Sequence, residues 1–206
     1  MAVTDAYATA ATYRAVISKT DTGDDSAIDD DLTAMSRYIE RRLRRFFTKD
    51  ASAVARVYLP AKYAADPRIL WTDDIVSVSS IKIDTDNDGS FSDESALAST
   101  DYELWPLNAA DGPEVEPFTM IYLPESGDEV QWRYRVEVTA IFGWNAVPTA
   151  IERAICHLTA VLRLETPRAT RQVTEMGDTI ETSQQAIRII DRIADAYGRN
   201  TAVGFI

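Results

Sequence analysis

Three aspartates at alternate positions form the clearest chemical motif of this sequence. The motif consists of Asp84, Asp86, Asp88, Gly89 and Ser90. In a D-x-D-x-D-G pattern the alternate carboxylates turn inward around a cation, and the glycine allows the sharp bend. Carboxylate and carbonyl oxygens are hard ligands that suit Ca²⁺. The sequence therefore predicts a calcium site made by the three carboxylates and the backbone carbonyl of Ser90.

The motif departs from a helical calcium loop at its twelfth position. Ser95 stands where an EF-hand has a bidentate glutamate, although Asp93 and Glu94 are adjacent. The flanking runs, SSIKI and SF, are typical of strands, so we expect a calcium-binding hairpin. An acidic turn that joins two strands without a metal is the alternative interpretation. We expect no other cofactor.

The residue types that usually carry catalysis give little support to an enzyme. Cys156 and His157 are the only cysteine and histidine, and neighbours on a helix point about 100° apart, so they cannot form a dyad. The sequence has no G-x-S-x-G, P-loop or G-x-G-x-x-G motif. We therefore expect a protein that is not an enzyme. The single cysteine also excludes an internal disulfide and fits a reducing cytosol.

The negative charge of the sequence is concentrated in one segment. The chain has 33 acidic residues and 21 lysines and arginines, which gives a net charge of −12. The 50 residues between Lys82 and Arg133 contain 13 acids and no basic side chain, whereas the other 20 acids nearly balance the bases. This segment is interpreted as a solvated face, a cation site or a surface that repels phosphate. Tight non-specific DNA binding is not expected.

Length and composition are those of an ordinary globular protein. The 206 residues are 46% hydrophobic and 26% charged, which excludes collagen-like, coiled-coil and wholly disordered chains. The first residues, MAVTDAYATA, lack the basic and apolar regions of a signal peptide. Because no apolar run approaches the roughly 18 residues that cross a bilayer, we expect a soluble protein without a membrane partner.

Two helices are predicted in the first 50 residues. The run 9–18 predicts a short helix capped by Thr9. The run 28–47 predicts an amphipathic helix with an apolar face that consists of Ile28, Leu32, Met35, Ile39, Leu43 and Phe46. The opposite arginine face consists of Arg37, Arg41, Arg44 and Arg45. These arginines complement the helix dipole and an acidic neighbour, or they form a phosphate-binding stripe.

The middle of the chain has the pattern of a β structure. Short runs between residues 54 and 142 are rich in β-branched and aromatic residues and are separated by Pro, Gly and Asp breaks. In the last run Val136, Val138 and Ala140 alternate with Glu137, Thr139 and Ile141, as in a strand with one buried face. We therefore expect a mostly antiparallel β portion.

Two further helices are predicted after the β portion. Pro148 opens a helix with an apolar stripe broad enough for two partners, which contains Ile151, Ile155, Leu158, Val161 and Leu162. An irregular crossover is expected over 168–181. The last helix is predicted to begin at a capping box at Thr182 and to end at Gly198.

Together these elements predict an α+β fold. We expect an α-helical bundle, made of N-terminal helices, a long central helix and a C-terminal helix, with an inserted antiparallel β portion. A single domain is predicted over 1–199, with helical parts at 1–50 and 147–199 and a β-rich part at 51–146. Residues 200–206 are predicted to form a tail. Its Val203, Phe205 and Ile206 either fold onto the chain's own core or dock on a partner.

In this order the segments resemble the head-to-tail adaptor, or connector, proteins of long-tailed double-stranded-DNA bacteriophages and of gene transfer agents. The most specific match is VEVTAIFGWNAVPTAIERAICHLTAVLRLE at 136–165: a strand, an aromatic-Gly-aromatic turn, and Val-Pro opening a long helix. The stretches DDDLTAMSRYIERRLRRFF at 29–47 and DYELWPLNA at 101–109 also match. The long acidic middle departs from the family's pattern.

The resemblance implies a non-enzymatic structural virion protein. Such a protein forms a ring of about twelve copies that docks beneath the portal protein and seats a tail-side stopper or tail terminator. The implied location is the head–tail junction of the virion, reached from the host cytoplasm during assembly. DNA would pass through this conduit without sequence-specific binding.

The resemblance also assigns roles to residues. The stripe Ile151, Ile155, Leu158, Val161 and Leu162 would pack neighbouring subunits. Portal or partner binding would fall to Val203, Phe205, Ile206, Arg37, Arg41, Arg44 and Arg45. The alternative is a calcium-dependent binding module that is not part of a virion, and a third interpretation is a hydrolase that holds a metal with the acidic segment.

Overall fold

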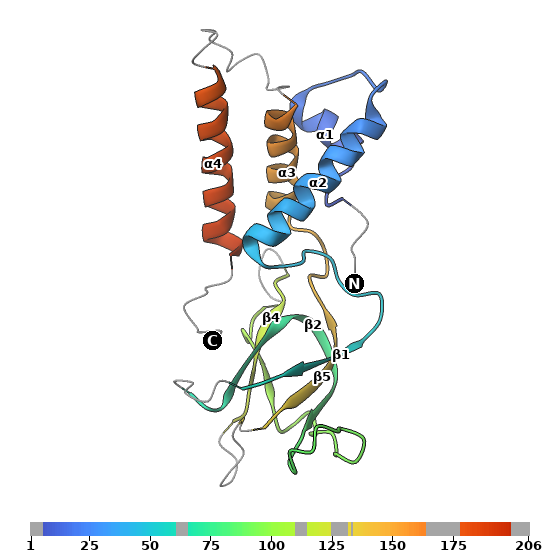
Figure 1. The fold of residues 1–206 in the computed structure, drawn as a ribbon, viewed down its shortest axis with the longest axis vertical. Coiled ribbons are helices and arrows are strands. Elements are labelled where there is room, and N and C mark those ends of the chain that lie inside the picture. The colour runs from blue at the N-terminus through green and yellow to red at the C-terminus, as the bar shows by residue number, and fades with distance from the viewer. Residues whose placement is uncertain are drawn as a thin grey trace. The chain divides into compact units, whose positions relative to one another are not determined.

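The described residues fall into two compact units. The computed structural model describes residues 6–60, 66–109, 115–124, 132, 134–163 and 178–198, without the side chains of 178–185. A helical unit is built from the described residues of 1–45 and 147–202. A sheet unit is built from those of 46–146. Figure 1 traces the helices and strands of each unit along the chain.

The helical unit is organised around one central helix. Its helices are α1 (Ala10–Ile17), α2 (Asp25–Leu43), α3 (Thr149–Leu162) and α4 (Asp178–Tyr197). The broad apolar stripe of α3 allows it to pack against each of the other three, and Figure 1 shows α4 running alongside it. The fully buried side chains include Tyr13, Ile28, Leu32, Ile39, Ile151 and Ile155. None of the helices in the described ranges has the length and apolarity needed to cross a membrane.

The N-terminal helices confirm the predicted cap but not the predicted end of the second helix. The hydroxyl of Thr9 accepts a hydrogen bond from the backbone N–H of Thr12 at 3.1 Å, which caps α1. The second helix ends at Leu43 rather than at residue 47, because Arg44 adopts a left-handed conformation with φ 53°. Residues after Leu43 therefore no longer follow the helical spacing of 3.6 residues per turn. Phe46, predicted on the apolar face, is 50% exposed, and Phe47 is fully buried instead.

The last helix begins earlier than predicted. It starts at Asp178 rather than at Thr182, so the end of the expected crossover is helical. An acidic residue at the first helical position is favoured by the helix dipole. The predicted end is confirmed, because α4 stops at Tyr197 and the N–H of Gly198 donates to the carbonyl of Ala194 at 2.9 Å. Residues 164–177 lie outside the described residues.

The sheet unit contains an antiparallel sheet of five strands in its described part. The strands are β1 (Val54–Tyr58), β2 (Ile69–Ile83), β3 (Glu103–Trp105), β4 (Phe118–Tyr122) and β5 (Val136–Phe142). Their order in the sheet is β1-β5-β2-β4-β3. Burial alternates along β5, with Val136, Val138 and Ala140 fully buried, which confirms the alternation predicted for this strand.

The long strand β2 joins two sequence runs that were expected to be separate. ILW of the first run and IVSVSSIKI belong to one strand of 15 residues, which pairs with β4 in its first half and with β5 in its second. The polar residues 72–74 lie between the two runs and are part of the strand. Asp74 can be buried there because its carboxylate accepts a hydrogen bond from the indole N–H of Trp144 at 3.0 Å. Register shifts near residues 72–74 bend the ladder without ending it.

The predicted fold class is therefore wrong in its balance. The sequence predicts a helical bundle with an inserted β portion, whereas the structure is a mixed α+β fold in which a five-stranded sheet builds its own core. That core contains Leu70, Ile75, Ile81, Ile121, Leu123, Trp132, Val136, Val138, Ala140 and Phe142. Its residues come from distant strands, and local periodicity does not reveal that they share one interior.

Candidate functional site

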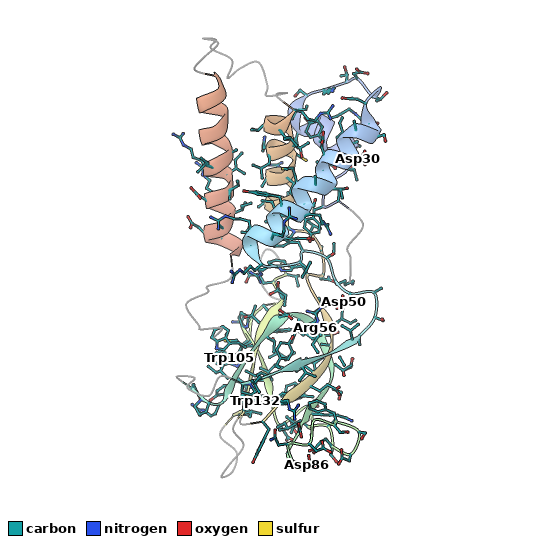
Figure 2. The ribbon with its side chains drawn as sticks, in the orientation of Figure 1. Asp30, Asp50, Arg56, Asp86, Trp105 and Trp132 are labelled. Atoms are coloured by element: carbon teal, nitrogen blue, oxygen red, sulfur yellow. The ribbon has the colours of Figure 1, made fainter. Side chains whose placement is uncertain are left out.

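The turn after β2 brings the three predicted calcium ligands together. One carboxylate oxygen from each of Asp84, Asp86 and Asp88 lies within 4.8 Å of those from the other two. Asp84, directly after β2, is fully buried, whereas Asp86 and Asp88 are exposed. Figure 2 shows Asp86 among the side chains of this turn. We call these three residues the aspartate cluster.

Backbone hydrogen bonds hold the carboxylates of the cluster in place. Each carboxylate accepts a bond from a backbone N–H further along the turn: Asp84 from Gly89 at 3.1 Å, Asp86 from Asp88 at 3.1 Å, and Asp88 from Ser90 at 2.6 Å. Gly89 has a φ of 89°, which L side chains rarely adopt. The motif's glycine is therefore used for the bend that the sequence predicts.

Among the described residues, Asp84 finds hydrogen-bonding partners for only one of its two carboxylate oxygens. Its Oδ2 accepts the Gly89 N–H and pairs with the Nε of Arg135 at 3.0 Å. Its Oδ1 is buried and has no hydrogen-bond partner among the described residues. A buried anionic oxygen without a partner loses its hydration without replacement, which is costly.

The electrostatic environment of Asp86 is set by competing effects. The hydrogen bond from the backbone of Asp88 lowers its pKa, but desolvation and the charges of Asp88 and Asp93 outweigh that bond. The net effect raises the pKa of Asp86 above its ordinary value. The cluster therefore concentrates more negative charge than its own backbone donors compensate.

Glu94 is the residue at this site whose role the sequence did not define. Its Oε1 accepts hydrogen bonds from the backbone N–H and the hydroxyl of Thr85, at 2.6 and 2.8 Å. A β-bridge between Lys82 and Ala96 returns the chain beside the end of β2 and places Glu94 there. The available signal was the glutamate one position before Ser95, where an EF-hand carboxylate is missing.

The structure divides the predicted arginine face into two pairs. Arg37 pairs with Glu40 at 3.2 Å and lies over the ring of Tyr7, and Arg45 donates to the carbonyl of Tyr197 at 3.0 Å. These two arginines serve the helical unit itself. By contrast, Arg41 on α2 and Arg44 at its C-terminus are exposed.

The predicted subunit-packing stripe of α3 lies mostly inside the helical unit. Ile151 and Ile155 are fully buried and Leu158 is 5% exposed, so the unit's own core covers them. Val161 is half-buried and Leu162 is 53% exposed. A role in subunit packing stays a prediction, for which Leu162 offers the exposed surface. The predicted docking residues Val203, Phe205 and Ile206 lie outside the described residues.

The aromatic-Gly-aromatic turn at 142–144 has a structural role within the sheet unit. Gly143 has a φ of 107°, and a Cβ at this position would lie 1.9 Å from the carbonyl oxygen of Thr48. Its N–H donates to the carbonyl of Asp74 at 2.7 Å, and the next residue, Trp144, donates to the Asp74 carboxylate. The sequence motif gave no indication that Thr48 and Asp74 are its partners.

Arg163, near the end of the matched stretch 136–165, forms ion pairs with two aspartates of the helical unit. Its guanidinium contacts Asp24 at 2.6 Å and Asp31 at 2.7 Å, and Lys19 also contacts Asp24. The hydrogen bond from Lys19, helped by the charge of Arg163, holds the pKa of Asp24 below its ordinary value. These contacts join the C-terminus of α3 to the start of α2.

Cys156 is not poised for chemistry. Its thiol is fully buried in α3, and burial raises its pKa to about 11. The thiolate needed for nucleophilic attack is therefore scarce at neutral pH.

Comparisons with known proteins give a structural likeness. No family model matches the chain, and no curated protein matches its sequence. The neck of an empty gene transfer agent particle, computed with C6 symmetry, contains a chain that matches with a TM-score of 0.50 and 18% identity, over 95% of this chain and 91% of that chain. A chain in the virion of a native gene transfer agent particle matches with a TM-score of 0.49 and 16% identity, over the same shares of the two chains.

This chain has the fold of a gene transfer agent neck chain. The likeness spans both units, because 95% of this chain is covered. The resemblance drawn from the motifs at 29–47, 101–109 and 136–165 is thereby confirmed at the level of the fold. Because only 18% of the residues are identical, the match does not transfer the role of any single residue.

Proposed function

We propose that this chain is a structural virion protein that joins the portal to the tail as a head-to-tail adaptor. The observation that carries the proposal is its fold likeness to a gene transfer agent neck chain, which extends over 91% of that chain. The match covers nearly the full length of both chains, so the likeness concerns the whole fold rather than one small motif.

The chemistry of the described residues supports a role in assembly rather than in catalysis. The buried thiol of Cys156 has a raised pKa, which argues against a cysteine nucleophile. The motif at 142–144 has a structural explanation: Gly143 lies tightly against the backbone of Thr48, and Trp144 donates a buried hydrogen bond to Asp74. These residues of the matched stretch at 136–165 thus build the fold.

Partner surfaces are proposed from the groups that remain exposed. Arg41 and Arg44 offer positive charge, and Leu162 offers an exposed apolar side chain for a neighbouring copy in a ring of about twelve. The apolar residues of 200–206 would dock on the portal, while a stopper or tail terminator would bind the ring's opposite side. The acidic segment would let DNA pass without adhering to the conduit.

The decisive experiment locates the chain in the particle. For this purpose the chain carries an inserted epitope tag. A tag next to Thr9 would risk disturbing the α1 cap, so the tag is placed at Gly23, in the exposed loop before α2. Gold-labelled antibody should then decorate purified particles at the head–tail junction. Decoration of the capsid faces or of the tail tip would contradict the adaptor assignment.

Loss of the protein gives a second test. Producer cells that lack it should accumulate packaged heads and separate tails, and supplying the wild-type protein should restore joined particles. Normal joined particles without it would exclude the adaptor role. The alternative, a calcium-dependent binding module outside any virion, predicts instead that purified particles do not contain the chain, which mass spectrometry of the particles decides.

A further inference from the structure

We infer that the turn between Asp84 and Glu94 is a calcium site, in which the buried Oδ1 of Asp84 and the carboxylates of Asp86 and Asp88 bind one ion. This inference is independent of the proposed function, because it rests on the described geometry of the sheet unit alone. Three features of the turn support it: an unsatisfied buried oxygen, an imbalance of charge, and a donor set that selects the metal.

The unsatisfied oxygen is the observation that distinguishes this turn from an ordinary acidic loop. Asp84 is fully buried, and its Oδ2 is occupied by Gly89 and Arg135. Its Oδ1 is also inaccessible to solvent and lacks a hydrogen-bond partner among the described residues. A native fold rarely leaves an anionic oxygen buried in this way unless a cation or a water completes it.

The charge balance of the cluster favours a divalent cation. Three carboxylates converge within 4.8 Å, and the described ion pair that reaches them comes from Arg135. One guanidinium neutralises one carboxylate, so two negative charges remain close together. A single divalent ion would neutralise both and remove their mutual repulsion.

The donor set selects calcium over other common divalent ions. The cluster offers carboxylate oxygens, and the carbonyl of Ser90 follows at the position expected in the motif. Oxygen ligands do not favour zinc, which prefers nitrogen and sulfur. Calcium accepts six to eight oxygens in flexible geometry, whereas Mg²⁺ demands a near-ideal octahedron and retains its waters. The irregular turn, with its left-handed Gly89, therefore suits calcium better than magnesium.

The ion would also fasten the turn to the sheet. Asp84 follows the last residue of β2, and its backbone N–H donates to the carbonyl of Arg135 at 3.0 Å. Glu94 holds the other side of the turn through Thr85. Calcium bound at the cluster would therefore link the end of β2 to the loop that follows it, so that metal binding stabilises the folded sheet unit.

The test uses the full-length protein, first stripped of metal with a chelator. Calorimetric titration with calcium chloride should show binding to one site, and thermal unfolding in calcium should have a higher midpoint than unfolding in chelator. Magnesium chloride at the same concentration should give a clearly smaller shift. No binding heat and no midpoint shift at millimolar calcium would overturn the site.

Charge-matched variants separate a specific site from general screening of an acidic surface. Asp86→Asn and Asp88→Asn alter exposed residues, so they should fold, and each should weaken calcium binding by about tenfold or more. Asp30→Asn removes the same charge from an exposed position on α2 and should leave the affinity unchanged. Equal weakening by Asp30→Asn and Asp86→Asn would show screening only and would refute the site.

Asp84 itself needs a different comparison, because its loss also breaks the ion pair with Arg135. Asp84→Asn is expected to abolish calcium binding, and circular dichroism shows whether the variant is folded. If it is folded and binds calcium as the wild type does, the buried oxygen is not a ligand and the inference fails. If it is unfolded, the Asp86→Asn and Asp88→Asn titrations decide.

Discussion

The indole N–H of Trp144 donates a 3.0 Å hydrogen bond to the carboxylate of Asp74, a residue 70 positions earlier in the chain. Both residues are almost completely buried. The backbone of Asp74 takes part as well, because its carbonyl accepts the N–H of Gly143. The middle of β2 is thereby locked to the turn that follows β5. A motif that resembles a family signature in sequence thus acts as a structural clamp inside the sheet unit.

The clamp predicts the cost of removing the indole N–H. Trp144→Phe keeps an aromatic ring against Phe47 but leaves the buried Asp74 carboxylate without this donor. We expect the free energy of unfolding to fall by about 1 to 3 kcal/mol, measured by urea denaturation. Trp71→Phe is the matched control, since Trp71 is 43% exposed, and should change it by less than about 0.5 kcal/mol. Equal effects of the two substitutions would contradict the clamp.

Gly143 should be intolerant of any side chain. In Gly143→Ala the new Cβ would meet the Thr48 carbonyl oxygen at 1.9 Å, at a φ of 107° that alanine rarely adopts. We expect a loss of at least about 2 kcal/mol in the free energy of unfolding. Gly23→Ala is the control, because its nearest neighbour is a side-chain oxygen at 3.4 Å. A Gly143→Ala protein as stable as the Gly23→Ala protein would show that the turn can relax.

Local signals in the sequence were sufficient for the caps, several helix ends and the position of the aspartate cluster. The Thr9 cap, the Gly198 stop and the alternation along β5 depend on residues that are neighbours in sequence, so spacing alone predicts them. The aspartate cluster was found for the same reason, because its members lie within five consecutive positions.

Features that depend on distant partners were missed. The polar residues between the two halves of β2 appear as a break in the sequence, because their compensation by Trp144 comes from 70 residues away. The weight of the sheet in the fold was underestimated as a result. Likewise, helical periodicity cannot reveal that Arg45 is engaged by the carbonyl of Tyr197, 152 positions away, while Arg41 and Arg44 remain exposed.

The raised pKa of Cys156 predicts a thiol that reacts slowly. Because burial raises this pKa from 9.0 to about 11, the folded protein should be modified by a disulfide reagent far more slowly at pH 8 than the urea-unfolded chain. Since the unfolded thiol ionises first, stability is unaffected below about pH 9 and falls as the pH rises from 9 toward 11. Equal rates in the folded and unfolded protein at pH 8 would contradict this environment.

The two pairs of arginines should have separable effects. Arg45→Ala removes the bond to the Tyr197 carbonyl and should lower the midpoint of thermal unfolding. Replacing the exposed Arg41 and Arg44 together by alanine should leave the midpoint nearly unchanged but weaken attachment to portal-bearing heads. Normal attachment of that double variant would remove these residues from the proposed partner surface.

The same arginines are not expected to bind DNA in the isolated subunit. With a net charge of −12, the chain should show no measurable affinity for duplex DNA at physiological salt in a fluorescence anisotropy titration. Micromolar binding that falls steeply with salt, and that the double alanine variant loses, would instead support the phosphate-binding interpretation of the arginine face.

Deleting residues 200–206 tests whether the apolar tail belongs to the chain's own core or to a partner. Burial of Phe205 and Ile206 on the portal would contribute about 1.5 to 3 kcal/mol for each side chain before ordering costs, and the copies of a ring would act together. The truncated subunit should therefore unfold at nearly the wild-type midpoint and fail to attach to portal-bearing heads. Replacing only Phe205 and Ile206 by serine should reproduce that defect. A truncated protein that unfolds several degrees lower yet still attaches would place the tail in its own core.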